Sequence, residues 1–231
     1  MRRLLPLAAT LLLVACASAP PPPEWQGQSF AALKSYTEAY LSGNTRVAEV
    51  EFERAKAEVA RTGRPDLMAR IELLRCATQV ASLVVAPCTA YHALAQDAVA
   101  ADQTYASFIA GRWDTLQAAQ LPMHYRALVT PSQAQTSLTN QLQQGATAAS
   151  QSKLKQIEDP LARLVAAGAL IQREPLSSAD LDLAVETASA QGWRRPLIAW
   201  LGVQLKRQQT AGEAGATAKT QRRIDLVLQS N

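Results

Sequence analysis

The chain has few of the residues that build catalytic and metal sites. It contains two histidines, His92 and His124, in 231 residues. Neither belongs to a Glu-x-x-His or His-x-x-x-His pattern, which excludes the helical metal-binding pair. Gly-x-Ser-x-Gly elbows and glycine-rich phosphate loops are also missing from the sequence. We therefore predict a protein that is not an enzyme and that holds neither a metal nor a cofactor.

Aromatic residues are scarce as well, at 5%, whereas 48% of the residues are hydrophobic. β-Sandwiches prefer β-branched and aromatic residues, so an apolar content dominated by alanine and leucine favours closely packed helices. The formal net charge of +4 is small, and Arg2 and Arg3 at the start of the chain supply part of it. Nucleic-acid binding needs a strong basic surplus, so we predict no nucleic-acid partner.

The first residues have the layout of an export signal. Arg2 and Arg3 precede an apolar stretch from Leu4 to Val14. A membrane-spanning helix needs about 20 apolar residues, so this stretch is too short to span and matches a secretory signal. The tetrapeptide Leu13-Val14-Ala15-Cys16 then resembles the lipobox of bacterial lipoproteins. The resemblance implies cleavage before Cys16, a diacylglycerol on its thiol, and a further fatty acid such as palmitate on the new amine.

Acyl chains of this kind hold a protein on a membrane, because each buried methylene contributes about 0.8 kcal/mol to attachment. In enteric members of the lipoprotein family, Asp after the cysteine retains the protein on the inner membrane. Ala17 therefore implies the outer membrane, with the domain facing the periplasm. Pro20 to Pro23 favour a stiff polyproline II spacer of roughly 12 Å. The predicted segments are a signal peptide over 1–15, the acylated cysteine and spacer over 16–28, and a single all-helical domain over 29–231.

Two further cysteines, Cys76 and Cys88, predict a disulfide. The periplasm is oxidising, and an exported domain with two cysteines usually pairs them. The bridge would close a loop of about thirteen residues and contribute roughly 3 kcal/mol to stability. Redox motifs have closer spacing and zinc sites need more ligands, so a structural bridge is the interpretation we adopt.

The rest of the sequence predicts an all-α fold. Apolar residues recur at helical spacing, as in Leu67, Ile71 and Leu74. Asp159 before Pro160 and Ser177 before Asp180 have the chemistry of helix N-caps. The predicted helices span residues 30–42, 47–61, 65–81, 88–99, 103–113, 124–128, 132–144, 160–171, 178–191, 196–209 and 216–228. The polar segment 132–144 is predicted as an exposed helix, with a mobile connector as the alternative.

Two places have the pattern of a helix pair with a tight turn. They are the segment 39–44 followed by Ala48, Phe52 and Ala55, and the segments 200–202 and 211–213 followed by Ala218, Ile224 and Val227. Both resemble the hairpins of tetratricopeptide-type repeat proteins. The resemblance implies irregular antiparallel helical hairpins in an α-solenoid-like domain. The 34-residue period of that family is not maintained between the two places, so a compact helical bundle is the alternative.

Hairpin repeats of this kind imply a concave surface for a peptide or a partner protein. The candidate contacts are Tyr36, Tyr40, Arg70 and Arg75, although the interpretation we favour for them is a role in the core or on a solvated face. The segment Trp193-Arg194-Arg195 either contacts an acidic partner or forms an inter-helix loop in which Trp193 packs over a helix end.

The function that we predict is that of a membrane-anchored, non-enzymatic scaffold or accessory lipoprotein for another envelope protein. The alternative is a peptidoglycan-active or small-ligand-binding lipoprotein. Glycan cleavage needs a glutamate with a raised pKa in a cleft, and Glu72 stands between two apolar neighbours. Arg70 and Arg75 flank it on the same helix, so paired, solvated charges explain Glu72 without catalysis.

Overall fold

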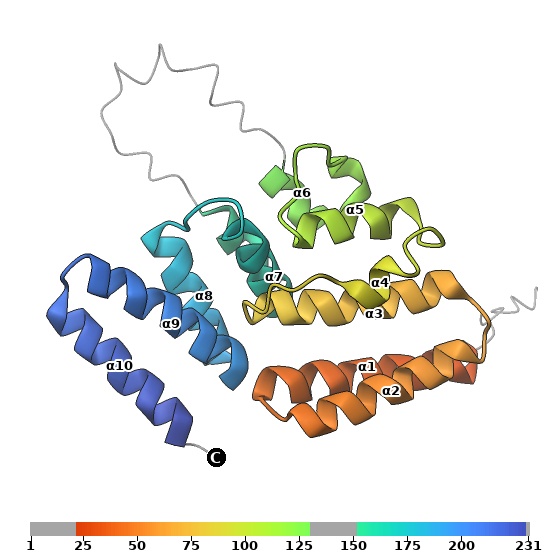
Figure 1. The fold of residues 1–231 in the computed structure, drawn as a ribbon, viewed down its shortest axis with the longest axis horizontal. Helices are drawn as coiled ribbons and strands as arrows, with labels where there is room; N and C mark the ends of the chain where they lie inside the picture. Colours follow the sequence, from red (N-terminus) through yellow and green to blue (C-terminus); the bar gives the residue numbers. More distant parts are fainter. Residues whose placement is uncertain (1–21, 130–151, 230–231) are drawn as a thin grey trace, which may run out of the picture.

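The computed structural model of the protein describes residues 22–129 and 152–229. Within these stretches every regular element is helical, which confirms the all-α fold class (Figure 1). The α-helices are α1 (Glu24–Ser42), α2 (Thr45–Ala60), α3 (Pro65–Ala81), α4 (Thr89–His92), α5 (Ala100–Ile109), α6 (Met123–Val129), α7 (Pro160–Leu170), α8 (Ser178–Ala190), α9 (Arg194–Thr210) and α10 (Ala214–Gln229). Two short 3-10 turns, η1 (Ala118–Gln120) and η3 (Lys153–Gln156), precede α6 and α7. The export signal, Cys16 and the predicted helix over 132–144 lie outside the described residues.

The first two helices form the hairpin that the sequence predicts. Gly43 ends α1 in the left-handed region, at φ 95°, where glycine has no Cβ to clash. The side chain of Asn44 then accepts a hydrogen bond of 3.2 Å from the backbone N–H of Val47 and so starts α2. Phe52 of α2 packs against Tyr36 of α1, with ring centroids 5.0 Å apart.

The helix α1 begins earlier than the predicted helix over 30–42. It starts at Glu24. Ser29 is a buried residue inside the helix, 4% exposed. Proline is tolerated next to the first helical turn, because the N–H that it lacks has no partner there. Pro23 can therefore stand directly before the helix.

The middle of the chain also departs from the prediction of one helix over 88–99. Only α4, Thr89–His92, is helical there, and turns follow it. The side-chain amide of Gln103 donates to the carbonyl oxygens of Ala95 (3.2 Å) and Ala98 (2.9 Å). The carbonyl oxygens of Ala95 and Ala98 lie outside a helix, and Gln103 supplies their hydrogen bonds. The chain can therefore turn at this point before α5 begins.

The centre of the fold is the crossing of α3 and α7. Gly168 of α7 lies against the backbone of Val80 in α3, and a Cβ at this glycine would lie 2.9 Å from Val80 Cγ1 and 3.0 Å from its carbonyl carbon. Trp200 of α9 is fully buried beside the end of α3, and its indole N–H donates to the carbonyl oxygen of Ala81 at 3.0 Å. The buried side chains from α1 to α9 form one continuous core.

The C-terminal helices begin at caps that the sequence predicts. Asp159 accepts a hydrogen bond of 2.7 Å from the N–H of Ala162 at the start of α7. Ser177 accepts one of 3.0 Å from the N–H of Asp180 at the start of α8. Beyond Gly192 the helix α9 begins two residues before the predicted Pro196, and α10 runs back along it (Figure 1).

Candidate functional site

Two of the predicted partner contacts, Tyr36 and Tyr40, are core residues. They are 0% and 7% exposed, because the face of α1 that carries them packs against α2. Burial raises the pKa of the Tyr36 phenol far above its ordinary value, since the charged form would lose its hydration. Both side chains are buried, which agrees with the core role that the sequence favours for them.

The predicted contact Arg75 has partners within the fold. Its guanidinium makes two hydrogen bonds to the carboxylate of Glu49 on α2, at 2.8 and 2.9 Å. It also lies over the ring of Phe52, 4.7 Å from the centroid. Both bonds are donated by Nη2, and this charge-assisted pair joins α2 to α3.

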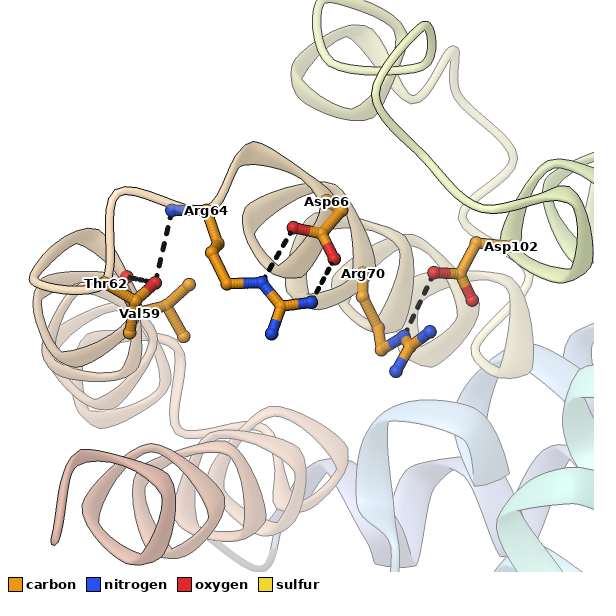
Figure 2. A network of polar contacts seen from close by, with 6 residues as sticks. All are labelled: Val59, Thr62, Arg64, Asp66, Arg70 and Asp102. Atoms are coloured by element: carbon orange, nitrogen blue, oxygen red, sulfur yellow. Dashed lines mark hydrogen bonds and ion pairs between the residues drawn. The ribbon is translucent and has the colours of Figure 1, made fainter. Parts of the chain in front are cut away.

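The fourth predicted contact, Arg70, remains accessible. Its side chain is 56% exposed, and its Nε donates to Asp102 Oδ2 of α5 at 3.0 Å. Figure 2 shows this ion pair together with the pair between Arg64 and Asp66 at the start of α3, whose shorter bond is 2.6 Å. Arg70 therefore neutralises Asp102 at the junction of α3 and α5.

The Trp193-Arg194-Arg195 segment is an internal connection. Trp193 is 8% exposed and precedes the first turn of α9. Arg195 donates to the carbonyl oxygen of Tyr40 and to the hydroxyl of Thr45, both at 2.7 Å. Its guanidinium lies 4.2 Å from the centroid of the Tyr40 ring. The segment holds α9 against the turn between α1 and α2, as the inter-helix loop interpretation expects.

The residues considered for catalysis or metal binding lie apart from one another. Glu72 is buried, 5% exposed, and pairs with Lys56 Nζ of α2 at 3.5 Å, not with its neighbours Arg70 and Arg75. His92 belongs to α4 and His124 to α6. Over residues 22–129 and 152–229, no three His, Cys, Asp or Glu side chains are grouped as they would be around a metal ion.

Cys76 of α3 and Cys88 before α4 lie at disulfide distance, with Cα atoms 6.0 Å apart. This separation is typical of a bridged pair. The bridge would tie the end of α3 to the segment that turns back over it, where the chain has little regular structure.

An apolar groove at the C-terminal helices was not predicted from the sequence. It has a volume of about 1000 Å³ and lies between the end of α7, the link to α8, and one face of α9. Its apolar lining comes from Ile171, Leu176, Leu181, Ala199 and Val203. Gly202 also lines it, and a Cβ built there would meet no atom within 4 Å. The glycine at this position therefore leaves the groove open along α9.

The rim of the groove is basic. Arg173, Lys206 and Arg207 line it, against one acidic residue, Glu174. Arg207 donates to the carbonyl oxygen of Leu176 at 2.8 Å, which leaves its charge without a carboxylate. Lys206 has no ion-pair partner among the described residues, whereas Arg173 lies 3.3 Å from Asp114. The edge of an apolar groove thus carries two cations that no acid of the described fold neutralises.

A second cavity, of about 370 Å³, lies among α3, α5, α6 and α7. Leu73, Leu74 and Val165 form apolar walls. The polar residues that line it are Arg70, Thr78, Asp102, Tyr105, His124, Tyr125 and Asp159. Burial raises the pKa of Tyr105 to about 12 and lowers the pKa of His124.

Comparison with known proteins gives no match: no family model, no curated protein and no solved structure is significantly similar to this chain. Within the described residues, no helix is both long enough and apolar enough to cross a bilayer.

Proposed function

We propose that this protein is a lipid-anchored envelope protein that binds another envelope protein and carries out no chemistry of its own. The lipobox-like sequence ending at Cys16 supports the anchor and the location, on an outer membrane with the domain facing the periplasm. The groove between α8 and α9 supports the binding role, and it is the observation on which the proposal depends.

The shape and lining of the groove suit an amphipathic helix of the partner. A helix docks by inserting apolar side chains at positions i, i+3, i+4 and i+7 into an apolar groove. The apolar side chains of Ile171, Leu181 and Val203 line the groove. The open space beside Gly202 lets the backbone of a docked helix approach α9 closely.

The charges on the rim determine which helix fits best. Lys206 and Arg207 have no carboxylate partners within the described fold. A partner helix with Asp or Glu beside its apolar stripe would pair with them, and a basic helix would be repelled. We therefore take the occupant to be an acidic amphipathic helix.

The arrangement of the helices supports the same role. The pairs α1–α2 and α9–α10 are antiparallel hairpins that flank the crossing of α3 and α7 (Figure 1). We take this as an irregular assembly of helical hairpins, solenoid-like in organisation, whose C-terminal hairpin helps to form the binding groove. Stacked hairpins of this type leave one surface of the stack free for partners.

Photo-crosslinking in the envelope tests the proposal. A photoreactive residue at Val203 should trap one partner through a segment that is acidic and amphipathic. Lys206→Glu should remove the cross-link, whereas Lys219→Glu on α10, which makes the same change of charge away from the groove, should keep it. Exchanging the partner's paired acid for lysine should restore the cross-link to the Lys206→Glu protein.

A variant that fills the groove gives an independent arm. Gly202→Trp should abolish the cross-link, and Gly215→Trp should not, because both glycines have open space at Cβ but only Gly202 lines the groove. A cross-link that survives both Gly202→Trp and Lys206→Glu would exclude the groove as the docking site.

A further inference from the structure

The cavity among α3, α5, α6 and α7 has a charge pattern different from that of the groove. Asp102 is neutralised by Arg70 at 3.0 Å. The carboxylate of Asp159 accepts one hydrogen bond, from the N–H of Ala162, and has no cationic partner among the described residues. Asp159 is an exposed residue that lines the cavity beside its apolar walls, and the N-terminus of α7 offsets part of its charge.

The surroundings of Asp159 are aromatic. Tyr105, Tyr125 and His124 line the same cavity as Asp159. The two tyrosine rings stack with centroids 5.8 Å apart, and the His124 ring lies 4.1 Å from Tyr125. Phenol rings and hydroxyl oxygens add negative potential and hydrogen-bond acceptors for a cation.

The other charges that line the cavity do not oppose a cation. Desolvation lowers the pKa of His124, which disfavours a positively charged imidazole at the cavity. The N-terminus of α7 contributes about half a positive charge, which the full charge of Asp159 exceeds. Arg70 is engaged by Asp102 at the edge of the cavity.

We propose that this cavity is a binding site for a small primary amine carried on an apolar group. The ammonium would donate to Asp159 and to a tyrosine hydroxyl, and the apolar group would pack on Leu73, Leu74 and Val165. Small-molecule sites commonly combine mostly apolar walls with a few convergent polar groups, as this cavity does. The site is separate from the groove, so this proposal does not depend on the docking of a partner.

Isothermal titration of the purified whole chain with benzylammonium tests the proposal. Asp159→Asn removes the charge but keeps a residue that caps helices equally well, so the fold is retained. We expect the variant to bind at least about tenfold more weakly. Glu158→Gln makes the same change of charge at the neighbouring residue, which is also exposed but does not line the cavity, and should bind as the parent does.

Two further arms separate charge recognition from nonspecific apolar binding. Benzyl alcohol, nearly the same in shape but neutral, should bind at least about tenfold more weakly than benzylammonium to the parent chain. Tyr105→Phe should weaken the binding of benzylammonium, because it removes one acceptor from the cavity. Absence of benzylammonium binding, equal binding by the alcohol, or full affinity in Asp159→Asn would each overturn the proposal.

Discussion

Substituting alanine for Gly168 should destabilise the protein, although alanine is the better helix former. A Cβ at Gly168 would press on the backbone of Val80, with its carbonyl carbon 3.0 Å away, whereas ordinary contacts begin at 3.4 Å. Backbone cannot rotate away as a flexible side chain can, so α3 and α7 would have to separate. Such a shift would disturb Trp200, whose indole bonds to the end of α3.

The magnitude follows from two opposing terms. Alanine gains about 1 kcal/mol over glycine in a helix interior, while forcing extra volume into a packed core costs about 1–3 kcal/mol. Because the contact is with backbone, we take the upper end and expect a net loss of about 2 kcal/mol. Gly202→Ala gains the same helix propensity, and the new Cβ would have no atom within 4 Å. This variant should therefore be more stable than the parent by about 1 kcal/mol.

Thermal unfolding followed by circular dichroism checks both values on the same chain. For a protein of this size 1 kcal/mol moves Tm by about 2–4 °C. Gly168→Ala should lower Tm by about 4–8 °C, and Gly202→Ala should raise it by about 2–4 °C. Equal shifts of the same sign in the two variants would refute the close approach of α3 to α7.

Three further predictions concern the cysteines and the tyrosines. Non-reducing mass spectrometry should find the pair Cys76 and Cys88 together two hydrogen atoms lighter than two free thiols. A Cys76→Ala, Cys88→Ala double variant should lose about 3 kcal/mol of unfolding free energy in chemical denaturation. Free thiols in envelope material would contradict the bridge. Cys16→Ser should abolish processing and the incorporation of labelled palmitate, and persistent labelling would exclude Cys16 as the anchor. Burial raises the pKa of all five tyrosines, Tyr105 to about 12, so the folded chain holds protons that the unfolded chain releases near pH 10. The associated stability is complete below pH 10 and declines as the pH rises toward 12; tyrosinate absorbance that appears near pH 10 while the helices remain folded would contradict this.

Local signals predicted the helices well because they depend on few neighbouring residues. Gly43 with Asn44 ends one helix and starts the next, and Asp159 and Ser177 cap α7 and α8 as predicted. The start of the first helix was predicted wrongly because a local signal was misleading. Ser29 has the chemistry of an N-cap but is buried within α1, which begins at Glu24.

Long-range packing could not be predicted from the same signals. Tyr36 and Tyr40, four residues apart, share a helix face, but their spacing does not say whether that face is covered. The groove arises from residues of α7, α8 and α9 that approach only when the helices are packed. The one local signal of the groove in the sequence is Gly202. It lies inside a helix, and no neighbouring atom requires a glycine at that position.

The bonds of Arg195 to the turn between α1 and α2 span 155 and 150 residues of sequence. During synthesis the first hairpin emerges long before this arginine. The turn of the hairpin gains these two bonds only when most of the polypeptide is present, and contacts this distant in sequence form slowly. The C-terminal third of the chain is therefore the part that completes folding.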